Sequence, residues 1–147
     1  MVTFRTKNYK EDLGYMGFAC LRSTIAGLFA PELKGLYVEY CMRELPSYSG
    51  EKYELENKRI REEYETKVDE ICHKNPNHEK VFDFLHMCDS EGEIDSDICK
   101  AIWEVIKDHD DDENYGGYYG TDEPFTFSTF KKLVKDGIDS RKGIKWY

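Results

Sequence analysis

The sequence has no apolar run long enough to cross a membrane, because such a run needs roughly eighteen consecutive apolar residues. Its N-terminal stretch, MVTFRTKNYKED, also lacks the apolar segment of a secretory signal. These absences argue against a membrane protein and predict a cytoplasmic protein that is made without export.

Cysteine is also sparse. The chain has five cysteines, an odd number, and no C-x-x-C pair, so we predict mostly buried thiols rather than a disulfide framework. The nearest zinc candidate combines Cys72 and His73 with His86 and Cys88. Neither pair has the spacing of a zinc site, and we therefore predict no bound metal.

Signatures of catalysis are missing as well. There is no phosphate-binding loop, no G-x-G-x-x-G motif and no nucleophile elbow. We therefore expect a protein that is not an enzyme and has no cofactor. The GYMG segment at 14–17 has two glycines but no phosphate-binding pattern, and it predicts that the first helix begins close to a neighbouring segment.

What the sequence does have is enough apolar material for a core, since 39% of its 147 residues are hydrophobic and 14% are aromatic. Apolar residues recur at helical spacing over 15–45, 53–74, 81–88, 96–106 and from 128 to about 137. Pro31 interrupts the first range, and Asn77, Asp95 or Ser96, and Ser128 are candidate N-caps. The pattern predicts a single domain over 1–147, mainly α, with five or six helices.

Short strands are expected at three places: an edge strand at 2–7, a very short strand at 125–127, and the tail KGIKWY, where Trp146 either pairs in a strand or packs on the core. The helix over 53–74 is highly charged. Its acid-first pairs Glu54–Lys58, Glu63–Lys67 and Glu70–Lys74 have the spacing of stabilising ion pairs.

Negative charge is concentrated in one third of the chain. The net charge is −9, and residues 79–124 alone carry 15 acidic residues against 3 lysines. Such a density of carboxylates repels phosphate backbones, which argues against direct nucleic-acid binding and favours a basic protein surface as partner. We predict that the contacts come from two acidic stretches and adjacent tyrosines. These are Asp108, Asp110, Asp111, Asp112, Glu113, Tyr115, Tyr118 and Tyr119, with Asp89, Glu91, Glu93 and Asp95.

The tyrosines have other interpretations. Aromatic side chains beside acids and glycines suit a protein interface, but they can also stack on a nucleotide or close the core under a long loop. The segment over 108–124 is itself long for a connection without secondary structure, a feature typical of functional loops.

The segment VFDFLHMCDSEGEIDSDICKAIWEVI, 81–106, resembles a helix, EF-hand calcium loop and helix, with Gly92 at the sixth loop position and Ile94 at the eighth. The first loop position is Met87 and the twelfth is Ile98, where the EF-hand has acidic ligands. The resemblance implies a degenerate loop with too few oxygens for calcium.

The segments LGYMGFACLRSTIA, 13–26, and FLHMCDSEGEIDSDICKAIWEVI, 84–106, are similar to small uncharacterised proteins of Gram-positive bacteria and their phages. The resemblance implies no activity and no site residues. It implies that an inhibitor from a mobile element, which places carboxylates in a host protein's nucleic-acid groove, is one candidate function.

The first functional hypothesis is thus a non-enzymatic acidic binding protein that occupies a basic groove of a host nucleic-acid-binding or defence protein. Two alternatives stay open. One is a nucleotide or small-molecule sequestering protein with an aromatic pocket, and the other is a divalent-metal-binding module with an EF-hand-like loop.

Overall fold

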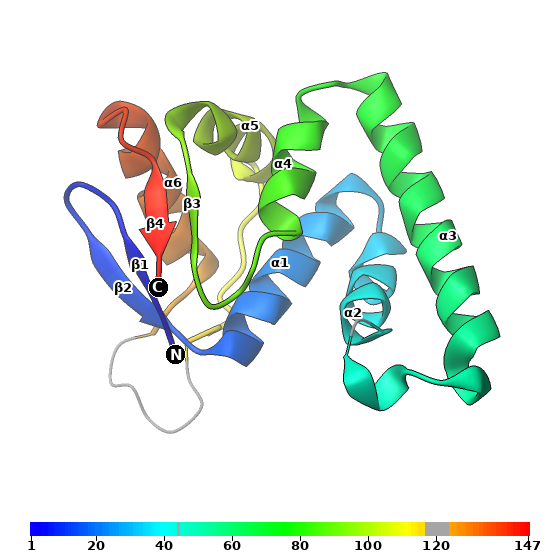
Figure 1. The fold of residues 1–147 in the computed structure, drawn as a ribbon. Helices are drawn as coiled ribbons and strands as arrows, with labels where there is room; N and C mark the ends of the chain where they lie inside the picture. Colours follow the sequence, from blue (N-terminus) through cyan, green and yellow to red (C-terminus); the bar gives the residue numbers. More distant parts are fainter. Residues whose placement is uncertain (44, 117–123) are drawn as a thin grey trace.

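Both ends of the chain lie in one small antiparallel sheet (Figure 1). The computed structural model describes residues 1–43, 45–116 and 124–147. Its strands are β1 (Val2–Arg5), β2 (Lys10–Leu13), β3 (Gly92–Ile94) and β4 (Ile144–Trp146), in the order β2-β1-β4-β3. Phe4 of β1 is opposite Trp146 of β4, and Ile94 of β3 is opposite Ile144. The alternation of buried and exposed residues along β4 places Ile144 and Trp146 in the core.

Helices account for most of the remaining described residues. They are α1 (Tyr15–Phe29), α2 (Leu33–Arg43), α3 (Glu51–Lys74), α4 (His78–Leu85), α5 (Ser96–Ile106) and α6 (Phe127–Asp139), with a 3₁₀ turn at Pro46–Tyr48. Figure 1 shows α2 and α3 on the side of α1 that is away from the sheet. Among the helices described, none has the length and apolar character needed to cross a bilayer.

Aromatic rings fill the space between the sheet and the helices. Phe18 of α1 lies 5.0 Å from Phe4 and 5.9 Å from Trp146, measured between ring centroids. Phe84 of α4 lies 5.7 Å from Trp146. All four side chains are buried, and burial of each large apolar side chain contributes roughly 1.5–3 kcal/mol. This aromatic cluster fixes α1 and α4 on the sheet.

The predicted class, mainly α in a single domain, is confirmed. The cap at Asp95 is also confirmed, since its Oδ1 accepts a hydrogen bond from the backbone N–H of Ile98 at 2.8 Å. The close approach expected at GYMG occurs at Gly17, where a Cβ atom would lie 1.7 Å from the carbonyl oxygen of Tyr115. The tail strand is confirmed as β4, and Trp146 is buried in it.

Other local predictions are wrong. The strand expected at 125–127 is the start of α6, because Thr126 caps this helix in a reciprocal capping box with Thr129. Asn77 makes no side-chain cap for α4. The strand at the N-terminus is internal rather than at an edge, since the C-terminal strand pairs with its open side.

Candidate ligand site between helices α1, α2 and α4

A hollow of about 710 Å³ lies between α1, α2 and the C-terminal end of α4. We call it the α1–α2 groove. Its volume is within the range of small-molecule pockets, which is roughly 300–1,000 Å³. The lining residues are Met16, Ala19, Arg22, Tyr37, Val38, Tyr40, Cys41, Met42, Leu45, Leu85, His86, Met87 and Asp89.

Several apolar side chains of this groove remain accessible to water. Met16 is 77% exposed, Leu45 is 50% exposed, and Val38 and Met42 are each about 40% exposed. Three of the four methionines in the chain line the groove. Methionine is flexible and polarisable, so it suits a surface that adapts to an apolar ligand.

One charged residue, Arg22, lies among these apolar side chains. It is only 4% exposed. Its Nη1 donates a hydrogen bond to the carbonyl oxygen of Met87 at 2.8 Å, and its guanidinium carbon lies 3.8 Å from the centroid of the Phe18 ring. The cation–π contact and the carbonyl together hold the guanidinium in place and offset part of its desolvation.

Apart from a polar contact with Tyr37, which favours the charged form, the rest of this guanidinium is unpaired among the described residues. Nε and Nη2 of Arg22 are both buried and make no hydrogen bond in the described part of the chain. Burial lowers the pKa of Arg22, although Tyr37 and Asp89 oppose the shift. Arginine nevertheless stays protonated near neutral pH, so the groove contains a fixed positive charge with two unused donors.

Tyrosine and histidine side chains form the adjoining wall. Tyr37 donates a hydrogen bond to the carbonyl oxygen of Leu85 at 2.9 Å. Tyr64 Oη lies 2.7 Å from Nε2 of His86, and the Tyr40 ring stacks on Tyr64 at 4.4 Å between centroids. Desolvation lowers the pKa of His86 against the influence of Asp83, which favours the neutral imidazole as the partner of Tyr64.

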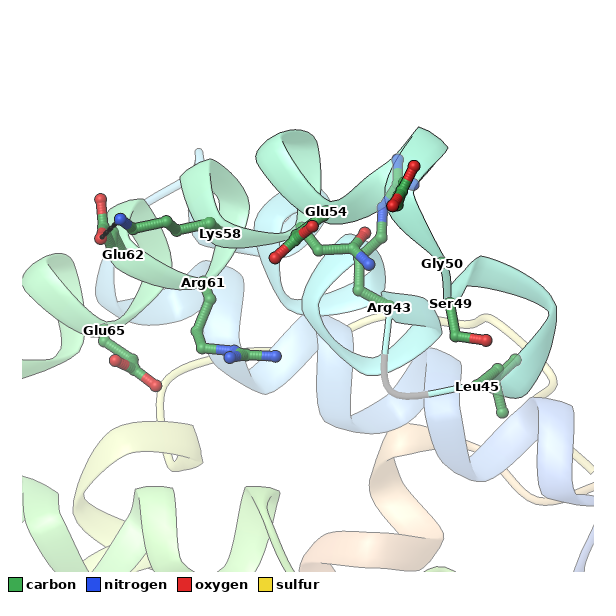
Figure 2. A pocket seen from close by; sticks show the side chains of 11 residues that line it. Arg43, Leu45, Ser49, Gly50, Glu54, Lys58, Arg61, Glu62 and Glu65 are labelled. Atoms are coloured by element: carbon green, nitrogen blue, oxygen red, sulfur yellow. Dashed lines mark ion pairs between the residues drawn. The ribbon is translucent and has the colours of Figure 1, made fainter.

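A second hollow, of about 800 Å³, lies along α3 and differs in character. Figure 2 shows that charged side chains of both signs surround it, including Arg43 from α2 and Lys58 and Glu62 from α3. Lys58 and Glu62 form an ion pair at 4.0 Å. This hollow has less apolar surface and more polar surface than the α1–α2 groove, so it suits an apolar ligand less well.

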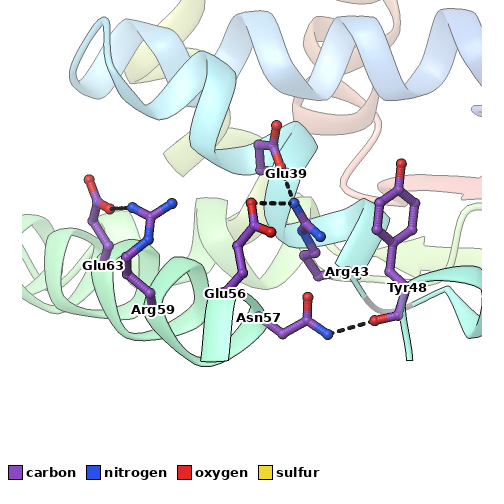
Figure 3. A network of polar contacts seen from close by, with 7 residues as sticks. All are labelled: Glu39, Arg43, Tyr48, Glu56, Asn57, Arg59 and Glu63. Atoms are coloured by element: carbon purple, nitrogen blue, oxygen red, sulfur yellow. Dashed lines mark hydrogen bonds and ion pairs between the residues drawn. The ribbon is translucent and has the colours of Figure 1, made fainter. Parts of the chain in front are cut away.

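The neighbouring polar network has a structural role. Arg43 Nη2 contacts carboxylate oxygens of Glu39 at 3.4 Å and Glu56 at 3.0 Å, and thus joins α2 to α3 (Figure 3). Nδ2 of Asn57 donates a hydrogen bond to the carbonyl oxygen of Tyr48 at 2.7 Å, which fixes the turn between these helices. We assign these residues to the stability of the α2–α3 arm.

The acidic stretch after α5 is held by Asp111. Its carboxylate accepts hydrogen bonds from the hydroxyl of Tyr115 at 2.7 Å and from the backbone N–H of Glu113 at 3.1 Å, and it lies 3.2 Å from Nε2 of His109. The remaining carboxylates of this stretch are exposed and form no ion pair with any described residue. They belong to Asp108, Asp110, Asp112 and Glu113.

The acidic residues around β3 are separated from that stretch. Asp95 and Asp108 flank α5, an 11-residue helix whose ends are about 16 Å apart. Asp95 caps this helix and Glu93 contacts Lys145 at 3.6 Å. Asp89 lines the α1–α2 groove. The predicted acidic residues therefore form two groups, and some of the carboxylates are already paired with groups of the same chain.

Of the three tyrosines predicted as partner anchors, the structure describes Tyr115 alone. Tyr115 is 4% exposed and its backbone N–H donates to the carbonyl oxygen of Phe125 at 2.7 Å. Its backbone carbonyl lies against Gly17 of α1, and its hydroxyl contacts Thr24 and Asp111, so this side chain is not exposed to a partner in this conformation. Tyr118 and Tyr119 lie outside the described residues.

The segment that resembles an EF-hand has a different backbone role. Gly92 lies in β3, where a Cβ atom would lie 2.0 Å from the Trp146 ring. The glycine is thus required by ring packing rather than by a sharp calcium-loop turn. Across residues 1–43, 45–116 and 124–147, no three His, Cys, Asp or Glu side chains are grouped to hold a metal ion.

All five cysteines are described and none forms a disulfide bond. Cys20, Cys41 and Cys88 are exposed and only Cys99 is fully buried, so the prediction of mostly buried thiols is wrong. The exposed thiol of Cys88 lies 3.1 Å from Ser90 Oγ, and this hydrogen bond lowers its pKa.

The groove was missed by sequence reasoning, although the sequence contains a signal for it. The α2 region has more apolar residues than one buried stripe needs. Val38, Cys41, Met42 and Leu45 form a second stripe at helical spacing beside the stripe that faces the core. Arg22 follows Met16 and Ala19 at intervals of three on α1.

No protein-family model, curated protein or solved structure matches the chain. The similarity to small bacterial and phage proteins stays a prediction, and the functional interpretation depends on the geometry of this chain.

Proposed function

We propose that this chain is a non-enzymatic binding protein and that the α1–α2 groove holds a small apolar ligand. The observation that supports this most directly is the combination of partly exposed apolar side chains around a buried, incompletely hydrogen-bonded arginine. Exposed apolar surface in a concave site costs free energy in water, roughly 25 cal/mol per Å². A ligand that covers Met16, Val38 and Met42 removes this cost.

Binding of the neutral dye Nile red tests the groove. Fluorescence of the dye should increase with the wild-type protein, and Val38→Asp should abolish the increase because the new carboxylate desolvates poorly in the groove. Leu55→Asp is the matched control, since Leu55 is 84% exposed on α3 and does not line the groove. Equal loss in both variants, or no binding to the wild type, would refute the groove as a ligand site.

A second candidate function is docking on a basic protein surface through the acidic stretch after α5. Four exposed carboxylates that form no ion pair with a described residue, arranged around the hydrogen bonds of Asp111, support it. Such charges mainly accelerate association and set specificity. A basic groove of a host nucleic-acid-binding or defence protein is the partner class that we propose for this surface.

The test is association with the partner that copurifies from the native host, measured at increasing salt. Replacing Asp110 and Asp112 with Asn should slow association roughly 3- to 10-fold at low salt. Replacing Glu62 and Glu63 with Gln changes the net charge equally at ion-paired positions of α3 and should have a smaller effect. If both double variants slow association equally, only the net charge matters and the acidic stretch is not the contact.

A further inference from the structure

We infer that the ligand of the α1–α2 groove is a small aliphatic carboxylate, recognised by the unused edge of Arg22. This inference rests on the proposed function of the groove. Among the described residues Nε and Nη2 make no hydrogen bond, although Tyr37 lies nearby, and these two donors share one edge of the planar guanidinium. Their spacing matches the two oxygens of a carboxylate, which accept a pair of parallel hydrogen bonds from such an edge.

The orientation of that edge is already fixed. Nη1 donates to the carbonyl oxygen of Met87, and the guanidinium plane lies over the ring of Phe18. Phe84 and Trp146 lie within 5.1 and 5.8 Å of the guanidinium carbon. A carboxylate therefore meets a positioned arginine and loses little free energy to ordering it.

No carboxylate of the described chain satisfies Arg22. The acidic residue of the groove is Asp89, which is exposed and forms no ion pair with Arg22 among the described residues. A buried cation without a carboxylate partner is unfavourable, because its desolvation is only partly offset. The vacant donors thus favour an anion that comes from outside the chain.

The other residues of the groove determine which chemical group attached to the carboxylate can bind. Its walls are apolar, with Met16, Val38, Met42 and Leu45 accessible, and these suit an aliphatic chain rather than a second charge. Nε and Nη2 are shielded from solvent, so a side chain must move before the carboxylate reaches them. We assign this movement to the flexible methionines of the groove.

Decanoate and decanol are the matched probes, since they share an aliphatic chain and differ in the carboxylate. Calorimetric titration of the wild-type protein should show decanoate binding at least about 10-fold more tightly. Decanoate, and not decanol, should shift the Arg22 Nε–H resonance in a nitrogen–proton correlation spectrum. Both measurements use the unmodified chain and do not depend on the folding of a variant.

Variants identify the recognition group. Arg22→Met should reduce the preference for decanoate to about equal affinity, and Asp89→Asn should strengthen decanoate binding roughly 2- to 5-fold by removing a nearby negative charge. Arg43→Met is the control, because Arg43 is also largely buried but lines the hollow along α3. It should leave the decanoate-to-decanol ratio unchanged.

Equal wild-type affinities for the two probes would overturn carboxylate recognition and leave the groove as an apolar site. A preference for decanoate that survives Arg22→Met would also overturn it, since another group would then bind the carboxylate. If neither probe binds although Nile red does, this inference fails and the groove stays an apolar site. If Nile red does not bind either, the proposed function fails as well.

Discussion

At the scale of single residues, two glycines at equivalent helix positions have opposite requirements. Gly17 is the third residue of α1 and Gly35 is the third residue of α2. A Cβ atom on Gly17 would overlap the carbonyl oxygen of Tyr115, whereas a Cβ atom on Gly35 would meet nothing within 4 Å. The first glycine is needed for packing, and the second has no such role.

Gly17→Ala should therefore lower the free energy of unfolding by about 2 kcal/mol or more, because α1 and the segment at Tyr115 must separate. Gly35→Ala should raise it by about 0.5–1 kcal/mol, since alanine has the higher helix propensity. Urea denaturation of both variants checks the pair. A neutral effect at Gly17 would mean that Tyr115 does not pack on α1 in solution.

Arg22 shows what residue-level reasoning misses. Arg22 shares an interval of three with Met16 and Ala19, but this spacing does not distinguish a buried arginine from a solvated one. Its burial depends on Phe18 from the same helix and on Phe84, Met87 and Trp146, which are distant in the sequence. The donors of Arg22 that lack hydrogen bonds indicate a ligand site only because these segments pack around the arginine and bury it.

At the scale of elements, helices were easier to predict than strands. A helix carries its periodic apolar stripe within one segment, whereas β3 has only three residues and forms because β4 pairs with it. The cap of α5 was predictable because Asp95 satisfies the N–H of Ile98 locally. The start of α6 was not, because Thr126 and Ser128 are both acceptable caps and a reciprocal bond with Thr129 decides between them.

The ion pairs of α3 also differ from those expected from the sequence. In the described chain, the bases pair differently from the acid-first pattern: Lys58 with Glu62, Arg59 with Glu63, and Lys67 with Glu32 at the start of α2. Each base has several acids within one turn, and exposed pairs differ little in free energy. Sequence spacing alone therefore cannot select among them.

At the scale of the whole molecule, His86 links the arm formed by α2 and α3 to the rest of the fold. Its Nε2 lies 2.7 Å from Tyr64 of α3, and its ring is close to Tyr40 of α2 and Phe82 of α4. Desolvation lowers the pKa of His86 in the folded protein, and Arg22 adds to the shift while Asp83 opposes it.

A lowered histidine pKa means that the unfolded chain binds the proton more strongly than the folded protein does. The free energy of unfolding should therefore decrease as the pH falls from about 7.5 through the pKa of an unfolded histidine, about 6.5, to about 5.5. The stability of His86→Gln should decrease less over this range, because the variant lacks the imidazole that contacts Tyr64. The control His73→Gln, in the last turn of α3, should follow the wild type. Urea denaturation at these pH values provides the measurement, and identical pH dependence in all three proteins would contradict the role of His86.

The mainly helical class, the approximate helix positions, the Asp95 cap and the C-terminal strand followed from the sequence by itself, because each depends on interactions within a short segment. The tertiary structure alone decided that β1 is internal, that Tyr115 is buried, that the acidic residues form two groups and that Arg22 lies at an apolar groove. These features depend on contacts between segments that are far apart in the chain. Local periodicity and residue spacing do not predict which distant surfaces pack together.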